Sequence, residues 1–202
     1  QLIPIPNKTI LRSIAFAADG KLYAGAQDEL GFFAPNKKGQ LRYTSLKTLL
    51  PPGEQTFADI WDIETAGRDV FFRANDKIMR LSGGALTVYK TTSSWLALSN
   101  FKGELVAQDE QKGLLVFRGG DWQPLMASSS LPAGCIITDI VPYNQDTCLA
   151  ASTRNGLFLL VKDKLLPFSL KNSPPERHFT SLAALDDQIF LAGTYSNGIV
   201  QF

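Results

Sequence analysis

The 202-residue sequence has little of several features that would point to a particular partner or chemistry. Its 20 basic and 19 acidic residues leave a net charge of +1, and it contains one histidine and two cysteines. A chain with no charge excess has no electrostatic reason to bind nucleic acid or an anionic membrane, and its basic residues are scattered rather than grouped. No apolar run approaches the roughly 18 residues of a membrane span. We therefore expect no nucleic acid partner and no direct membrane insertion of this segment.

The sequence also lacks the residue patterns that metal binding and nucleophilic catalysis usually require. A zinc site needs several convergent ligands, and His178 with two cysteines does not supply a recognisable set. A serine hydrolase would need His178 as its base, yet the sequence has no Gly-x-Ser-x-Gly motif. Gly83-Gly84 and Gly119-Gly120 indicate hairpin turns rather than a phosphate-binding loop. We expect no metal, no cofactor and no enzymatic activity.

The two cysteines, Cys135 and Cys148, leave the cellular compartment open. A hairpin turning near Asn144-Gln145 would place Val141, and not Cys135, opposite Cys148. Because a disulfide needs two close Cβ atoms, we expect two reduced, buried thiols.

The most informative feature that is present is an internal repeat. The segment Leu149–Leu157 (LAASTRNGL) returns 42 residues later as Leu191–Ile199 (LAGTYSNGI), with Leu, Ala, Asn and Gly at the same offsets. A period near 40 residues, built on short apolar runs separated by turns, is typical of a β-propeller blade.

The same period divides the whole chain into five units. A Gly or Lys opens one apolar strand in each unit, and the intervals between the openers are 46, 36, 43 and 42 residues. Gly, Asn and Asp lie between the strands, as tight hairpins require. We predict an all-β fold: a β-propeller fragment of about five four-stranded antiparallel blades with the last incomplete, forming one domain over residues 1–202. The predicted blades are 9–46, 58–90, 94–126, 135–170 and 179–202.

Both chain ends are predicted to be internal cuts. The chain begins without Met or a signal segment, and Phe202 closes an apolar run without a turn after it. The rest of a parent propeller is therefore an expected partner. An open blade edge would expose unpaired backbone groups, so pairing into a homodimer through that edge is also expected.

Strand alternation assigns the connections to two faces of the propeller. The first and third connections of each blade lie on one face and are tight turns. The second connections and the crossovers between blades lie on the other face, which collects the long loops 47–58, 127–134 and 171–178. Because loops on a rigid scaffold carry function, we predict that this second face, which includes Arg154 and Tyr195, binds the ligand.

Aromatic residues are the best candidates for ligand contact, since their faces bind the C–H surfaces of sugars. Trp61 and Trp95 lie near the starts of neighbouring units and Tyr195 lies in a loop. The predicted ligand-binding set is Trp61, Asp59, Trp95, Arg154 and Tyr195. For both tryptophans the alternative is packing in the blade core.

Two further groups would support an enzyme. Asp59 and Asp62 flank Trp61 and could form the carboxylate pair of a glycosidase, whereas the alternative is a strand with alternate polar exposure. His178 is either a ligand contact or acid–base group on a long loop, or a solvated loop histidine.

The segment Leu191–Val200 resembles the repeat of the two-component regulator propeller family, in which an apolar-x-Gly-Thr stretch precedes a short spacer and a Gly-apolar pair. Leu22–Phe33 resembles the opening blade of such sensors with Ala26 in place of Thr, and Val70–Met79 departs from the pattern by lacking both glycines. The resemblance implies a periplasmic sensor region of a bacterial hybrid two-component regulator with a triple-tyrosine module.

Many members of that family sense oligosaccharides. We therefore expect a non-enzymatic, extracytoplasmic, ligand-binding segment of a signal-transduction regulator with a small carbohydrate ligand. The alternatives are a propeller enzyme that acts on carbohydrate and a protein-interaction scaffold.

Overall fold

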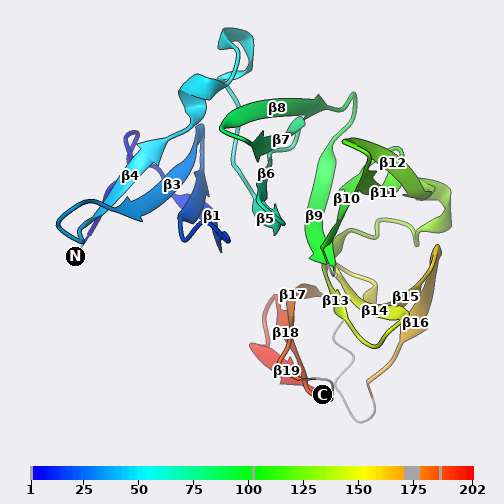
Figure 1. Ribbon diagram of the computed structural model, residues 1–202. Coiled ribbons are helices and arrows are strands. Elements are labelled where there is room, and N and C mark those ends of the chain that lie inside the picture. Colours follow the sequence, from blue (N-terminus) through cyan, green and yellow to red (C-terminus); the bar gives the residue numbers. More distant parts are fainter. Residues whose placement is uncertain (1, 102, 171–177, 187) are drawn as a thin grey trace. The chain divides into compact units, whose positions relative to one another are not determined.

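The computed structural model describes all residues except 1, 102, 171–177 and 187. The described strands form five antiparallel sheets, and the strands of each sheet follow one another in chain order (Figure 1). Four sheets have four strands and the fifth has three. The predicted all-β fold with five blades, the last of them incomplete, is confirmed.

The strands and short helices have the following bounds. The first sheet contains β1 (Leu11–Phe16), β2 (Leu22–Ala26), β3 (Glu29–Pro35) and β4 (Leu41–Ser45). The second contains β5 (Asp62–Ala66), β6 (Asp69–Arg73), β7 (Lys77–Ser82) and β8 (Ala85–Lys90). The third contains β9 (Trp95–Phe101), β10 (Glu104–Asp109), β11 (Gly113–Arg118) and β12 (Asp121–Met126). The fourth contains β13 (Ile137–Pro142), β14 (Thr147–Ser152), β15 (Gly156–Val161) and β16 (Lys164–Phe168). The fifth contains β17 (Phe179–Ala184), β18 (Phe190–Thr194) and β19 (Ile199–Gln201), and short 3₁₀ turns occur at η1 (Lys47–Leu49), η2 (Pro52–Glu54) and η3 (Ser128–Ser130).

The chain forms two compact units, residues 1–95 and 96–202. In the first unit one apolar core joins Tyr23 and Leu30 of the first sheet to Phe72 and Met79 of the second. In the second unit the fourth sheet packs on both sides, against the third sheet in one cluster and against the fifth in another. No helix among the described residues is long and apolar enough to cross a membrane.

The second strand of each four-stranded sheet is buried along almost its whole length. The buried runs are Tyr23–Ala26 in β2, Val70–Arg73 in β6, Leu105–Asp109 in β10 and Cys148–Ser152 in β14. A strand covered on both faces has no solvated side, which is why most of its residues are apolar rather than alternating with polar ones. The buried polar residues lie toward the ends of these runs: Arg73, Gln108, Asp109 and Ser152.

The first residues of the predicted second blade extend the first sheet. The Ile60 amide donates to the Ala26 carbonyl (3.1 Å), and Gln27 and Asp59 form an antiparallel bridge, so β5 begins at Asp62. The predicted pairing of Cys148 with Val141 is wrong, because Cys148 lies opposite Pro142. Both cysteines are nevertheless buried and are not joined by a disulfide, as expected.

Gln108 connects the third and fourth sheets from a buried position, with 3% of its surface exposed. Its side-chain Nε2 donates to the Cys135 carbonyl, and its Oε1 accepts from the Ile137 amide, each at 2.8 Å. Both ends of the side-chain amide are thus satisfied, as buried polar groups require. The contact fixes where the crossover from β12 enters the fourth sheet.

We expect Gln108→Leu to destabilise the second unit, because two buried backbone groups would lose their partner at a cost of about 1–3 kcal/mol. Thermal unfolding followed by circular dichroism measures the effect. Gln123→Leu, the same substitution at an exposed position of β12, is the control. Equal melting temperatures for the two variants would contradict the bridging role of Gln108.

Candidate functional site

A pocket of about 810 Å³ opens in the second unit. Its volume lies within the range of small-molecule sites, roughly 300–1,000 Å³. The lining residues come from the β10–β11, β14–β15 and β18–β19 loops, from the crossover after β12 and from the start of the fifth sheet. They are Leu96, Gln108, Glu110, Ser128, Leu131, Pro132, Ala133, Gly134, Cys135, Ile136, Thr153, Arg154, His178 and Tyr195.

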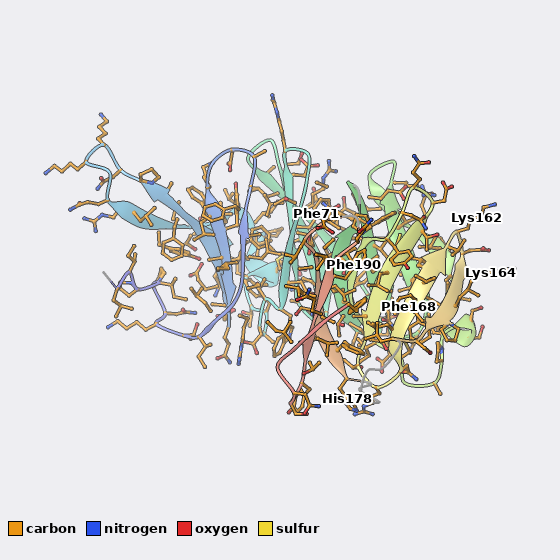
Figure 2. The ribbon with its side chains drawn as sticks, turned by 90° about the horizontal axis from the view of Figure 1, so that it is seen from below. Phe71, Lys162, Lys164, Phe168, His178 and Phe190 are labelled. Carbon is orange, nitrogen blue, oxygen red and sulfur yellow. The ribbon has the colours of Figure 1, made fainter. Side chains whose placement is uncertain are left out.

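Nearly all of these residues lie in second connections or crossovers, which are the segments assigned from the sequence to the binding face. The opposite face of the second unit carries the tight β15–β16 turn. In Figure 2, Lys162 of that turn and His178 of the pocket lie at opposite ends of the unit. The structure therefore places Arg154, Tyr195 and His178 around one pocket.

The two copies of the repeat build two of the loops at this pocket. The Ser152 hydroxyl donates to the Gly156 carbonyl (2.7 Å), and the Thr194 hydroxyl donates to the Gly198 carbonyl (2.9 Å). Both glycines have positive φ, +86° and +76°, which suits a residue without a Cβ. In both copies of the repeat, a hydroxyl residue and a glycine four positions later are joined by a hydrogen bond that closes the turn. The three residues between the hydroxyl residue and the glycine can therefore differ.

His178 ties these two loops together through its backbone. It forms an antiparallel bridge with Thr153, and its carbonyl accepts from the Tyr195 amide at 3.0 Å. The Tyr195 side chain is 81% exposed. An exposed aromatic ring therefore lies at the rim of the pocket, on a loop held by a backbone hydrogen bond to His178.

The backbone of the loop that contains Arg154 is strained, whereas the equivalent loop in the second copy of the repeat, which contains Ser196, is not. Arg154 has a φ of +101°, a region that costs a residue with a Cβ on the order of 1–3 kcal/mol. The Oδ1 atom of Asn155 is buried and accepts no hydrogen bond within the described part of the chain. In the other copy Ser196 has no such φ, and the Asn197 amide donates to the Thr194 hydroxyl at 2.9 Å. Such strain is concentrated at functional sites in proteins.

The Arg154 side chain is exposed and forms no hydrogen bond or ion pair with the described residues. Four other arginines do form ion pairs: Arg12 with Asp59, Arg73 with Asp62, Arg80 with Asp69 and Arg118 with Glu104. Arg154 therefore offers an uncompensated cation to the pocket. The planar guanidinium group suits bidentate binding of an anion.

Asp59 and Trp61 lie on the surface of the first unit, not at the pocket of the second unit. The Arg12 Nε donates to Asp59 at 2.9 Å, and the Arg12 guanidinium lies over the Trp61 ring, 5.2 Å from its centroid. Trp61 is 41% exposed. These residues form a small surface cluster and do not line the pocket of the second unit.

The Trp95 side chain is buried, with 2% of the residue exposed, and its carbonyl accepts from Arg73 at 2.8 Å. Its ring thus packs in the core, the alternative considered from the sequence, and presents no surface to a ligand. Asp62 is ion-paired with Arg73, so the two carboxylates considered for a glycosidase, Asp59 and Asp62, each hold an arginine. Among the described residues, no group of three or more His, Cys, Asp and Glu could hold a metal ion.

The loop 47–58, assigned to the binding face from its length, is fixed to the first unit. Its Leu50 and Phe57 side chains are buried in the core. Asp28 accepts from the Phe57 amide (3.1 Å) and from Lys47 (2.7 Å), while Glu54 binds the buried Lys77 (2.9 Å). Length alone did not distinguish this packed loop from an open one. The loop 171–178 lies outside the described residues except for His178.

Several pocket residues were not in the predicted ligand-binding set, although most of them lie in connections that were assigned to the binding face. Glu110 lies in the short β10–β11 loop, and residues 131–136 lie in the crossover, for which the only signal was its length. Cys135 also lines the pocket, but burial raises the pKa of its thiol. The thiol therefore stays protonated near neutral pH, which does not favour a nucleophilic role.

Comparison with solved structures shows the class of fold. The chain is similar to the WD40 β-propeller domain of Doa1, with a TM-score of 0.70 and 14% identity over 96% of this chain and 64% of that one. It is similar to virginiamycin B lyase from Staphylococcus aureus, with a TM-score of 0.66 and 16% identity over 98% and 71%. It is also similar to PorZ of the Porphyromonas gingivalis type-IX secretion system, with a TM-score of 0.67 and 16% identity over 100% and 33%.

At these identities the similarity establishes a β-propeller and no shared activity. The chain spans less than two thirds of the Doa1 domain and a third of PorZ. No protein-family model and no curated protein matches it. The resemblance of its repeat to the two-component regulator family thus stays a prediction, and what the chain shows is a β-propeller with a ligand-sized pocket in its second unit.

We expect Arg154→Gly to raise the stability of the second unit by about 1 kcal/mol, because glycine adopts the positive φ without strain. Thermal unfolding measures the change. Ser196→Gly, at the equivalent position of the unstrained loop, is the control and should lower stability slightly. A lower melting temperature for Arg154→Gly would instead show that the arginine side chain stabilises the fold.

Proposed function

We propose that this propeller segment is a non-enzymatic, extracytoplasmic sensor module that binds a small carbohydrate in the pocket of its second unit. The observation that carries the proposal is the pocket itself, about 810 Å³ in volume and lined by loops of a rigid β-scaffold. Sites of this size with a few convergent polar groups are typical of small-molecule binding.

The chemistry of the lining supports a sugar. The exposed Tyr195 ring offers an apolar face with a hydroxyl at its end, and an aromatic side chain buries area against a ligand at low entropic cost. Glu110, Arg154 and His178 line the same pocket and can hydrogen-bond to hydroxyl groups.

Two observations support a location outside the cytoplasm and a role in signalling. One is the resemblance of the repeat at Leu191–Val200 to the two-component regulator propellers. The other is the structural similarity to PorZ, which is described as a bacterial surface component. A ligand would then signal by binding one arrangement of the parent receptor more tightly than another. An alkaline phosphatase fusion to the parent protein tests the location, since that enzyme is active only after export.

A carbohydrate-active enzyme is the second candidate. The observation in its favour is that Glu110 and His178, two groups able to exchange protons, line the same pocket. Virginiamycin B lyase, one of the structurally similar propellers, is an enzyme by its name. Chromatography of oligosaccharides after prolonged incubation with the protein separates the two functions, because a sensor releases its ligand unchanged.

We expect isothermal titration calorimetry with a panel of oligosaccharides to identify a ligand, and Tyr195→Ala to weaken its binding by about 3- to 10-fold through loss of aromatic contact. Trp61→Ala, which removes an exposed aromatic residue from the first unit, is the control and should leave the affinity unchanged. Equal affinities of wild type and Tyr195→Ala, or loss of binding only in Trp61→Ala, would contradict the placement of the site.

A further inference from the structure

We infer that the ligand of this pocket is an acidic oligosaccharide whose anionic group is bound by Arg154. The inference rests on the proposed function, because it takes the pocket of the second unit to be the carbohydrate site. The inference adds to the proposed function that the carbohydrate is acidic and that Arg154 is the residue that selects it.

The first observation is the isolated charge of Arg154. Its guanidinium group forms no ion pair or hydrogen bond with the described residues, whereas Arg12, Arg73, Arg80 and Arg118 each bind an aspartate or glutamate. No ion pair is formed within the described residues by Arg42 or Arg68 either, but neither lines this pocket, so Arg154 is distinguished by its position. An arginine that is not used within the fold is available to a ligand, and its planar fork fits a carboxylate or a sulfate.

The second observation is the backbone that carries this side chain. The Ser152–Gly156 and Thr194–Gly198 turns are closed by the same hydroxyl-to-carbonyl hydrogen bond. Only the first of them has a residue other than glycine at positive φ, namely Arg154, next to the unsatisfied Oδ1 of Asn155. The turn therefore has an unstrained form, seen in the other copy, and the strained form is the one that presents the arginine.

The third observation concerns the other charges at the pocket. Glu110, on the β10–β11 loop, is the acidic side chain among the described lining residues, and it forms no ion pair with Arg154. An anionic ligand group at Arg154 would be repelled by Glu110. Replacing Glu110 by a neutral residue should therefore strengthen the binding of an acidic ligand, whereas replacing Arg154 should weaken it.

The test is calorimetry with three trisaccharides of matched length: a galacturonate trimer, a sulfated galactose trimer and a neutral galactose trimer. We expect the wild type to bind one of the acidic trimers more tightly than the neutral one. Arg154→Gln should weaken acidic binding about tenfold or more, because a charge-assisted hydrogen bond is lost, and should weaken neutral binding much less. Arg154→Lys should retain part of the preference.

Two matched variants complete the test. Arg68→Gln removes an exposed arginine from the β5–β6 turn of the first unit and should change no affinity. Glu110→Gln should strengthen acidic binding by about two- to threefold at low salt, and added salt should reduce this gain. Melting temperatures confirm that each variant is folded.

The outcomes separate the two proposals. Equal binding of acidic and neutral trimers, or an equal loss of both in Arg154→Gln, overturns the acidic ligand while the carbohydrate site stands. Binding of none of these trimers, nor of any other oligosaccharide in the panel, overturns the proposed function and with it this inference. The carboxylated and sulfated trimers distinguish which anionic group the site prefers.

Discussion

Coverage of both faces of the fourth sheet is the constraint on which the second unit depends. A blade whose second strand is buried along almost its whole length does not leave either face of that strand to water, so the sheet packs against its neighbours. In the second unit the fourth sheet meets this requirement on both sides, with Phe158 in one apolar cluster and Leu157 in the other. Because adjacent sheets share the burial, stability is distributed over the sheet-to-sheet contacts, and the open loops at the pocket need not contribute to it.

This constraint explains what could be predicted from the sequence. The strands are local features, short apolar runs between glycine-rich turns, and their repetition along the chain was enough to predict five blades with an incomplete last one. The start of β5 differs, because Ile60 has a strand-like sequence but pairs with Ala26 of the preceding sheet. That pairing is a contact between distant residues, and no local pattern encodes it.

The candidate site was predicted only in part, for a related reason. Arg154 and Tyr195 were found because the repeat marks which residues lie between the strands. Trp95 was placed in the ligand-binding set although its ring is in the core, since the sequence does not show which face of a strand a large side chain uses. Nor does it show that Glu54 binds Lys77 and fixes the long loop 47–58, because that ion pair joins residues 23 positions apart.

The turn that closes each copy of the repeat has a consequence for how such a protein can change. The hydrogen bond from Ser152 to Gly156, like that from Thr194 to Gly198, uses only the ends of the loop. The three residues between them, Thr153-Arg154-Asn155 in one copy and Tyr195-Ser196-Asn197 in the other, share a single asparagine. Mutations in these tripeptides can therefore accumulate without disturbing the scaffold, and gene duplication of a blade would supply a new variable tripeptide each time. Blade number and the chemistry of these loops can vary independently in such an architecture.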